Sequence, residues 1–301
     1  MKKKLLKNRF VVLFLFVFVT QAGIANAAKE PEVTENWAEI FAAEIAKSKS
    51  NLGPQCLYES DAQYKAAKKN LSQDEDLQIS NADFLADLQK NGIGAAYYNI
   101  SQYYETLPVC YMTQNEYLAL RMYTGSFYTQ INSALRQLNL SELKKYRLTI
   151  KFLMAGLNKL KDYVGVTKRG TSLKSELITN CKPGSAFADR GFLSTSVASG
   201  FGGQYRFILA SQSCKYIAPF SSYPNEEEVL CLPGTVFQIR YFNPKPNGSE
   251  LILQQAGKAA GQRLNIDDLI ETLEEHSETQ NPQSDNYWSQ SCQPESVIFE
   301  K

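Results

Sequence analysis

Three consecutive carboxylates follow a Tyr-Pro turn in the stretch Tyr223-Pro224-Asn225-Glu226-Glu227-Glu228-Val229-Leu230. They lead directly into an apolar segment that is typical of a strand. Successive side chains of an extended chain point to opposite faces, so we expect Glu226 and Glu228 on one face and Glu227 on the other. Taken alone, the stretch is typical of a solvated acidic turn. As a site, it would present two carboxylates beside an aromatic ring at the edge of a sheet.

Two further motifs lie at predicted strand ends and could act with these carboxylates. Arg169-Gly170 ends a short strand over 164–170. A guanidinium there suits a phosphate, and a glycine allows the backbone to approach a ligand. Ser194-Thr195-Ser196 closes a strand over 191–196, and alternation places the hydroxyls of Ser194 and Ser196 together. Each motif alone is more typical of an ordinary turn or polar strand.

The sequence lacks the residues that several common catalytic mechanisms require. His276, the one histidine, follows glutamates at the end of a polar helix, a surface position, so we expect no Ser-His-Asp or Cys-His relay. Neither a P-loop nor a dinucleotide-binding glycine motif occurs in the required context. No cysteine belongs to a Cys-x-x-Cys pair, and we predict no metal site. An enzyme built from this chain would work with carboxylates, hydroxyls and arginine.

The first 27 residues are typical of a secretory signal peptide. Five basic residues precede an apolar run over 10–19, and Ala25-Asn26-Ala27 supplies the cleavage site. The alternative is an uncleaved anchor. Cleavage would change the formal charge from +1 to about −4 and leave no basic tract for nucleic acid. Because no later apolar run is long enough to span a bilayer, we predict a soluble, secreted protein, either extracellular or periplasmic.

Six cysteines remain in the exported chain. Disulfides are the expectation for an even number of scattered cysteines in such a protein, but their pairing does not follow from the sequence. The six are Cys56, Cys110, Cys181, Cys214, Cys231 and Cys292.

The elements that would position these residues change character along the chain. Residues 28–163 have mainly helical periodicity, with a capping box at Thr113-Gln114-Asn115-Glu116 and a break near Tyr123–Ser126. Residues 164–245 have mainly strand patterns, and 246–301 form an extension with one helix capped by Asn265. Helices followed by strands predict an α+β fold.

The order Arg, Ser-x-Ser, Glu-x-Glu, with these flanking residues, resembles the arginine-specific mono-ADP-ribosyltransferases of the R-S-E class. The similarity is to vertebrate ecto-enzymes and bacterial ADP-ribosylating toxins. It covers roughly 83–242, including the helical segment Ala119–Arg136, the strand Gly191–Ser196 and the loop Tyr223–Leu230. The chain departs from the family at Lys168, where an aromatic residue is usual before the Arg-Gly pair.

The resemblance implies a fold of two small packed β-sheets around an NAD cleft with flanking helices. It implies transfer of ADP-ribose from NAD to a protein arginine, with release of nicotinamide and no metal. In this reading Glu228 stabilises the ribose charge, and Glu226 polarises the acceptor guanidinium. Arg169 and Gly170 bind NAD together with Ser194, Thr195 and Ser196. The aromatic Tyr223 contacts the target protein, and Glu227 has no assigned role.

Two alternatives remain open. An NAD glycohydrolase would use the same residues with water as the acceptor, and the sequence separates it from a transferase only through Glu226. A catalytically inactive adhesion or inhibitory module would keep the fold without the reaction. The target protein, the delivery route and the oligomeric state do not follow from the sequence.

Overall fold

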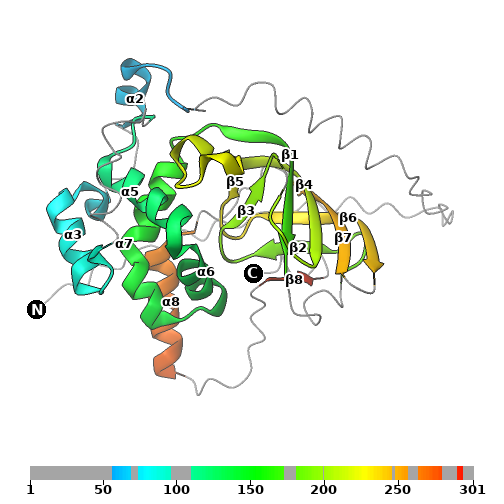
Figure 1. The fold of residues 1–301 in the computed structure, drawn as a ribbon. Helices are drawn as coiled ribbons and strands as arrows, with labels where there is room; N and C mark the ends of the chain where they lie inside the picture. The colour runs from blue at the N-terminus through cyan, green and yellow to red at the C-terminus, as the bar shows by residue number, and fades with distance from the viewer. Residues whose placement is uncertain are drawn as a thin grey trace, which may run out of the picture. The chain divides into compact units, whose positions relative to one another are not determined.

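A computed structural model of the chain describes residues 56–68, 74–95, 110–172, 181–198, 200–245, 248–256, 264–279 and 290–293 (Figure 1). All of them fall in the larger of two compact units, residues 35–301. The smaller unit, residues 1–34, contains the predicted signal peptide and lies outside the described residues.

The first described half of the chain is helical, as predicted. Thr113 and Glu116 form the expected capping box: each side chain accepts a hydrogen bond from the other residue's backbone N–H. The break predicted near Tyr123 is a π-helical turn, η4 (Tyr123–Phe127), and such turns are frequent at functional sites. The helices of this half are α2 (Asp61–Lys68), α3 (Asn81–Lys90), α5 (Gln114–Met122), α6 (Tyr128–Gln137) and α7 (Leu140–Leu157).

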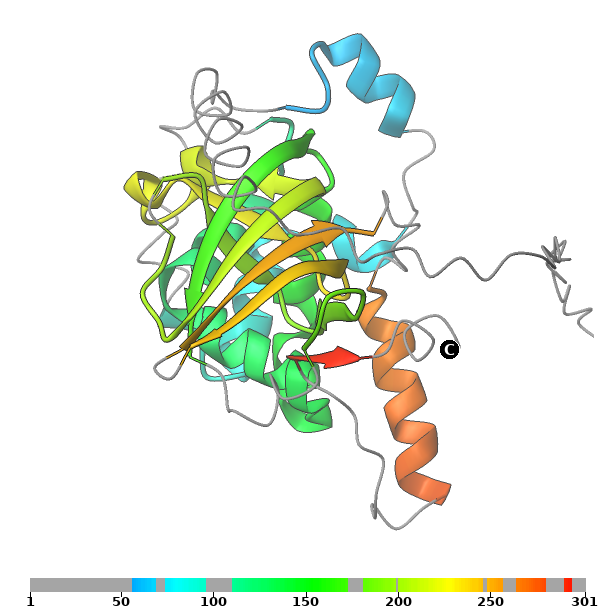
Figure 2. The same cartoon turned by 90° about the vertical axis from the view of Figure 1, so that its right-hand side faces the viewer.

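The strands form one hydrogen-bonded sheet within the described residues, in the order β1-β3-β5-β4-β7-β6-β2-β8. In Figure 2 the strands β1, β4 and β7 lie side by side in front of the helices. The strands are β1 (Asp162–Thr171), β2 (Ala186–Asp189), β3 (Leu193–Ser196), β4 (Tyr205–Tyr216), β5 (Glu228–Cys231), β6 (Val236–Lys245), β7 (Gly248–Gln255) and β8 (Gln290–Gln293). The α+β class is therefore confirmed.

The resemblance predicted two packed sheets, and the structure joins their strands into one. Strand β4 pairs with both β1 and β5, and β3 also pairs with both of them, so these four strands close a ring of pairings. The sheet curves around its own apolar core, which includes Phe187, Phe207 and Phe237. Hydrogen bonds therefore connect all eight described strands into one sheet instead of two.

The region predicted as an extension, residues 246–301, contributes a strand to the interior of the sheet. Strand β7 is parallel to β4 on one side and antiparallel to β6 on the other. Asn243, Pro244 and Lys245, although rich in turn-forming character, belong to β6, where they pair with Glu250, Ser249 and Gly248 of β7. Helix α8 (Ile266–Thr279) is the predicted helix, and the Asn265 side chain accepts from the Asp267 N–H.

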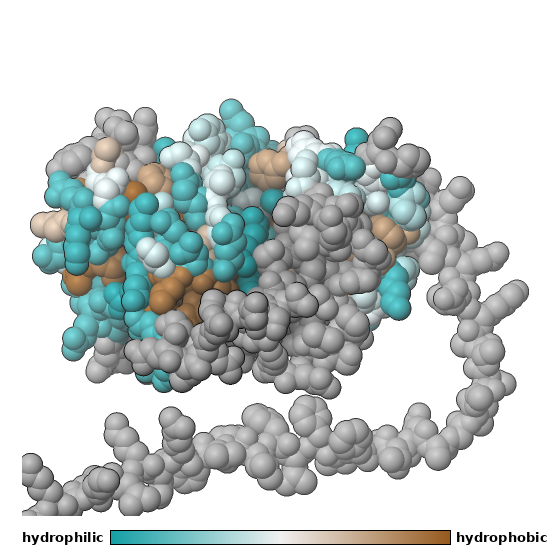
Figure 3. Space-filling view, turned by 90° about the horizontal axis from the view of Figure 1, so that it is seen from below, coloured by the Kyte–Doolittle hydropathy of each residue, from teal (hydrophilic) through white to brown (hydrophobic). Residues whose placement is uncertain are grey.

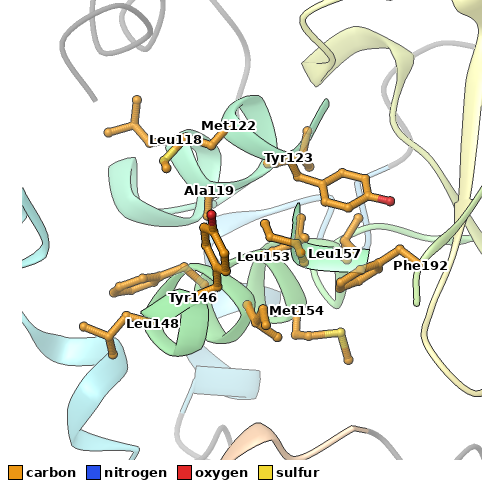
Figure 4. Close-up of a cluster of buried hydrophobic side chains, with 14 of the residues drawn as sticks. Leu118, Ala119, Met122, Tyr123, Tyr146, Leu148, Leu153, Met154, Leu157 and Phe192 are labelled. Atoms are coloured by element: carbon orange, nitrogen blue, oxygen red, sulfur yellow. The ribbon is translucent and has the colours of Figure 1, made fainter. Parts of the chain in front are cut away.

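A second apolar core lies among the helices and extends to the sheet. It includes Tyr123, Tyr146 and Leu153 from the helices and Phe192 from the segment before β3 (Figure 4). The Tyr123 and Phe192 rings pack with centroids 5.1 Å apart, and the Tyr123 hydroxyl points out of the cluster in Figure 4. On the face drawn in Figure 3, apolar residues gather between hydrophilic ones on the side of the helices.

The predicted disulfides are confirmed, and the structure supplies pairings. Cys56 is bonded to Cys110 and Cys214 to Cys231, while Cys181 is also disulfide-bonded. The second pair joins β4 to the end of β5, three residues beyond Glu228. No helix among the described residues is long and apolar enough to cross a bilayer.

Candidate active site

A cavity of ≈ 1020 Å³ lies between the helices and the ends of three strands. Helix α6 and the turn η4 form one wall, and β1, β3 and the segment that enters β5 form the other. Its lining residues are Tyr123, Thr124, Gly125, Tyr128, Thr129, Asn132, Ser133, Arg136, Gln137, Arg169, Gly170, Ser172, Ser194, Phe201, Tyr223, Glu226 and Glu228. The structure therefore brings together Arg169, Ser194, Glu226 and Glu228 in the lining of one cavity.

Arg169 lies on β1 at the base of this cavity. One terminal nitrogen, Nη1, donates to the Ser194 carbonyl at 2.6 Å. Its Nε is buried and has no hydrogen-bond partner. Burial lowers the pKa of the guanidinium from its ordinary value, yet arginine stays protonated in proteins. The cavity thus contains a fixed cation with an unused donor.

Glu228 is the first residue of β5 and only 4% exposed. Burial raises the pKa of this carboxyl to about 7, Glu226 adds to the increase, and the Ser194 hydrogen bond and the Arg169 charge oppose it. A buried carboxylate has few water molecules to solvate it, so its charge interacts strongly with whatever enters the cavity.

A chain of hydrogen bonds connects Glu228 to helix α6. The Asn132 amide donates to the Tyr123 hydroxyl at 3.0 Å, and the Ser194 side chain hydrogen-bonds both Tyr123 and Glu228. The Ser194 contact lowers the pKa of the Glu228 carboxyl, as expected when a hydroxyl donates to a carboxylate. These contacts link the Glu228 carboxyl to the helix side of the cavity.

Glu226 lies at the rim of the cavity in a 3-10 turn, Pro224–Glu226. It was predicted to share a face with Glu228 through strand alternation, but the strand begins only at Glu228. Glu227, between them, has left-handed backbone angles, φ 46° and ψ 49°. That turn brings both carboxylates to the cavity while Glu227 is not among the lining residues. Tyr223, 53% exposed, also lies at the rim.

Thr195 and Ser196 occupy different positions from Ser194. The Thr195 hydroxyl donates to the Val229 carbonyl at 2.7 Å, and the Ser196 hydroxyl donates to the Glu226 carbonyl at 2.7 Å. Neither residue is among those that line the cavity. This geometry gives no support to the prediction that they bind the dinucleotide, because their hydroxyls hold β5 and the loop before it.

Gly170 lines the cavity, but a glycine is required at this position because protein backbone, and not a ligand, lies close to it. A Cβ atom at this position would lie 1.7 Å from the Phe201 carbonyl oxygen. The strand end and the loop at Phe201 therefore approach too closely for any side chain.

Sequence reasoning gave no role to Arg136, which places a second guanidinium in the cavity. Its guanidinium forms a bidentate ion pair with the Asp189 carboxylate, with Nε–Oδ1 at 2.8 Å and Nη2–Oδ2 at 2.7 Å. Asp189 is 2% exposed. The sequence feature that could have indicated Arg136 is the regular four-residue spacing of Tyr128, Asn132 and Arg136. Residues four apart share one helix face, and these three polar residues face the cavity together.

The arrangement suits a dinucleotide. Two arginines can bind a diphosphate, and the buried carboxylate lies where positive charge on a sugar would be stabilised. Within the described residues, no group of three or more His, Cys, Asp or Glu side chains could hold a metal ion.

Comparisons with known proteins agree with this description. A family model described as NAD:arginine ADP-ribosyltransferase matches residues 61–261. Two proteins named NAD(+)--protein-arginine ADP-ribosyltransferase Tre1 are similar in sequence. The one from Serratia proteamaculans (strain 568) is 38% identical over 118 residues, 38% of this chain and 26% of that protein. The one from Pseudomonas putida (strain GB-1) is 37% identical over 133 residues, 42% of this chain and 26% of that protein. The matched segments thus span about a quarter of these relatives.

Among solved structures, the type III effector XopAI from Xanthomonas axonopodis pv. citri is similar with a TM-score of 0.49 and 20% identity. The match covers 66% of this chain and 100% of that chain.

Proposed function

Because the chain belongs to the NAD:arginine ADP-ribosyltransferase family, we propose that it transfers ADP-ribose from NAD to arginine side chains of proteins. Nicotinamide is the leaving group. The observation that carries this proposal is one cavity with the buried Glu228 and Arg169 at its base and Glu226 at its rim. The names of the Tre1 relatives support arginine as the acceptor.

The residues of the cavity fit NAD. Its volume, ≈ 1020 Å³, is at the upper end of the range for small-molecule sites, roughly 300–1,000 Å³. Arg169 offers a buried Nε without a partner, and Arg136 lies in the same cavity. We assign the diphosphate to these guanidiniums and the nicotinamide end to the neighbourhood of Gly170, Ser194 and Glu228.

The proposed reaction breaks the bond between the nicotinamide nitrogen and the ribose C1′. The electron pair stays with nicotinamide, which leaves as a neutral molecule, and positive charge develops on the ribose. Glu228 in its ionised form stabilises that charge. A guanidinium nitrogen of the acceptor then bonds to C1′ and loses one proton.

Glu226 is placed to assist the acceptor. Arginine is a poor nucleophile while it is protonated, so it needs a carboxylate beside it at the moment of attack. Glu226 is exposed at the rim, and partial desolvation by the neighbouring protein raises the pKa of its carboxyl from the ordinary value. With water in place of arginine, the same cavity would make the protein an NAD glycohydrolase, which is the second candidate function.

An assay with two readouts tests the proposal. The protein is incubated with NAD labelled in the ADP-ribose portion and with agmatine, a small arginine analogue. We expect label in ADP-ribosyl-agmatine and at least an equal amount of free nicotinamide, with any excess matched by free ADP-ribose. Label only in free ADP-ribose would favour the glycohydrolase, and no binding of NAD in a calorimetric titration would favour an inactive module.

The variant Glu226→Gln separates the two reactions. It should keep nicotinamide release within about threefold of wild type while transfer to agmatine falls about a hundredfold, the scale of positioned acid–base catalysis. Equal loss of both activities would contradict the assignment of Glu226 to the acceptor.

Export is part of the proposal. The basic and apolar segment over 1–27 supports it, as do the disulfides Cys56–Cys110 and Cys214–Cys231. Mass spectrometry of the protein secreted by a bacterial host should find a mature chain that starts at Ala28. A full-length chain retained in the cytoplasm would contradict export.

A further inference from the structure

Two anchors hold the loop that carries Tyr223 and Glu226. The first comes from β3 and the residue after it. The Ser196 hydroxyl donates to the Glu226 carbonyl at 2.7 Å, and the Val197 N–H donates to the Glu227 carbonyl at 3.1 Å. This anchor fixes the end of the loop that enters β5.

The second anchor comes from helix α5 and the turn η4. Arg121 Nη1 donates to the Ser221 carbonyl at 2.5 Å. The Ser222 hydroxyl donates to the Arg121 carbonyl at 3.0 Å, and the Ser222 N–H donates to the Thr124 hydroxyl at 2.9 Å. About a hundred residues separate the partners in the chain.

The environment makes this second anchor costly to lose. Ser221 is 1% exposed and Thr124 is 6% exposed. A buried donor or acceptor that loses its partner costs about 1–3 kcal/mol. The Thr124 hydroxyl also donates to the Leu120 carbonyl at 3.1 Å, so it cannot turn away without breaking a second hydrogen bond.

The two catalytic carboxylates depend on the anchors unequally. Glu228 belongs to β5, where it pairs with Ser196 of β3, and its carbonyl accepts from the Ile217 N–H. These contacts do not involve Arg121 or Thr124. Glu226 and Tyr223 lie outside the strand on exposed chain: the first anchor holds the Glu226 carbonyl, and Tyr223 lies between the two anchors.

We propose that Arg121 and Thr124 are positioning residues for the acceptor, and that they act through Ser221 and Ser222. They hold the stem of the loop so that Glu226 and Tyr223 stay at the rim of the cavity. The inference rests on the proposed function and extends it: losing Arg121 or Thr124 should affect transfer to arginine more than cleavage of NAD, because the backbone contacts of Glu228 include neither residue.

The adjacent residue shows that one turn serves both carboxylates. Tyr123 reaches Glu228 through Ser194, and Thr124 reaches the loop of Glu226 through Ser222. Two neighbouring residues of η4 therefore contact different parts of the site: Tyr123 contacts the side that holds Glu228, and Thr124 contacts the loop that carries Glu226.

The test compares two reactions in each variant: transfer to agmatine, and nicotinamide release in the absence of acceptor. Arg121→Met keeps the length of the side chain and removes the donor to Ser221. We expect transfer to fall about tenfold, because a misplacement of about 1 Å in a reacting group costs up to a hundredfold. Nicotinamide release should stay within about twofold, and Arg121→Lys should recover part of the transfer.

Ser222→Ala is the milder variant, and it removes a single side-chain hydrogen bond from the loop side. It should lower the ratio of transfer to hydrolysis about threefold, with the loss in kcat for agmatine and the KM for NAD unchanged. Its thermal midpoint should fall by no more than a few degrees, the scale of one lost hydrogen bond, so this variant decides the question even if Arg121→Met unfolds.

The outcomes separate the two proposals. A wild-type protein that cleaves NAD without modifying agmatine overturns the transferase function, and the positioning role falls with it. A wild type that transfers, with variants whose transfer and hydrolysis fall in parallel or do not change, overturns the positioning role alone. A selective loss of transfer in Ser222→Ala, with partial recovery in Arg121→Lys, supports both.

Discussion

Glu226 and Glu228 are two residues apart in the chain, yet they occupy opposite kinds of environment. Glu228 is 4% exposed, opens a strand and is held by Ser194. Glu226 is exposed on a short turn and is held through its backbone carbonyl. The left-handed backbone at Glu227 makes this contrast possible between near neighbours.

The difference matches two chemical tasks. Cleavage of the NAD bond needs a fixed carboxylate in a site that excludes water, because charge stabilisation is strongest there. Activation of an acceptor that arrives from another protein needs a carboxylate that the protein can reach. The buried region, with Arg169, Ser194 and Glu228, suits the first task, and the exposed loop suits the second.

The largest expected effect is on the buried carboxylate. Glu228→Gln should lower both nicotinamide release and transfer about a thousandfold, the scale for loss of one preorganised electrostatic group. Glu227→Gln is the matched control, because it makes the same change one residue away, outside the cavity lining. Nicotinamide release near the wild-type rate in Glu228→Gln would refute the reading of the site.

Stability should also separate the two carboxylates. The pKa of Glu228 is about 7 in the folded protein against an ordinary 4.5, so between these values the folded state binds more protons than the unfolded chain. The stability from this group is present below the ordinary pKa and is lost as the pH rises through 7. The loss amounts to about 3 kcal/mol.

Thermal melts of Glu228→Gln and wild type over a pH series measure this effect. The variant should melt at a higher temperature than wild type well above pH 7, and the difference should close near pH 4.5. Glu226→Gln should change the melting temperature much less, since that carboxylate is exposed. Equal shifts in the two variants would contradict the contrast in burial.

Arg169→Lys should weaken the binding of NAD, a step that hydrolysis and transfer share. A lysine keeps the charge but lacks the planar fork that binds a diphosphate. We expect the KM for NAD to rise about ten- to a hundredfold in both hydrolysis and transfer, measured with and without agmatine. Lys168→Arg is the control on the same strand and should leave KM unchanged; a rise confined to transfer would contradict the assignment.

The smallest effect on activity should come from substitutions of Tyr223 at the rim of the cavity. Tyr223→Ala should lower transfer to an arginine-rich polypeptide about tenfold, the scale of one aromatic contact in an interface. Transfer to agmatine and nicotinamide release should not change, because neither needs the protein surface. Tyr223→Phe should retain most of the activity toward the polypeptide, and a loss with agmatine as well would assign Tyr223 to the chemistry.

Much of the site was predictable because its signals are local. The capping box at Thr113 and the break at Tyr123 depend on residues within one turn of each other, and both occur in the structure. The motifs at Arg169, Ser194 and Glu228 were recognised from their order and flanking residues, and the structure places them in one cavity.

The parts that were not predictable depend on partners far apart in the chain. Arg136 gains its place from Asp189, and the stem of the loop gains its hydrogen bonds from Arg121 and Thr124. Strand β7 was not predicted, because the turn-forming residues before it are equally typical of a hairpin and of the end of a domain.

The sequence alone predicted the helix-then-strand order and the presence of disulfides, because periodicity reports on local structure and cysteine content on oxidation, and its resemblance to the R-S-E class indicated the residues that could carry the chemistry. The tertiary structure decided which cysteines pair, which hydroxyls face the cavity and why both carboxylates reach it. Those outcomes depend on burial and on long-range hydrogen bonds. Glu226 and Glu228 were expected to meet through strand alternation, and they meet through a turn that only the packed fold sustains.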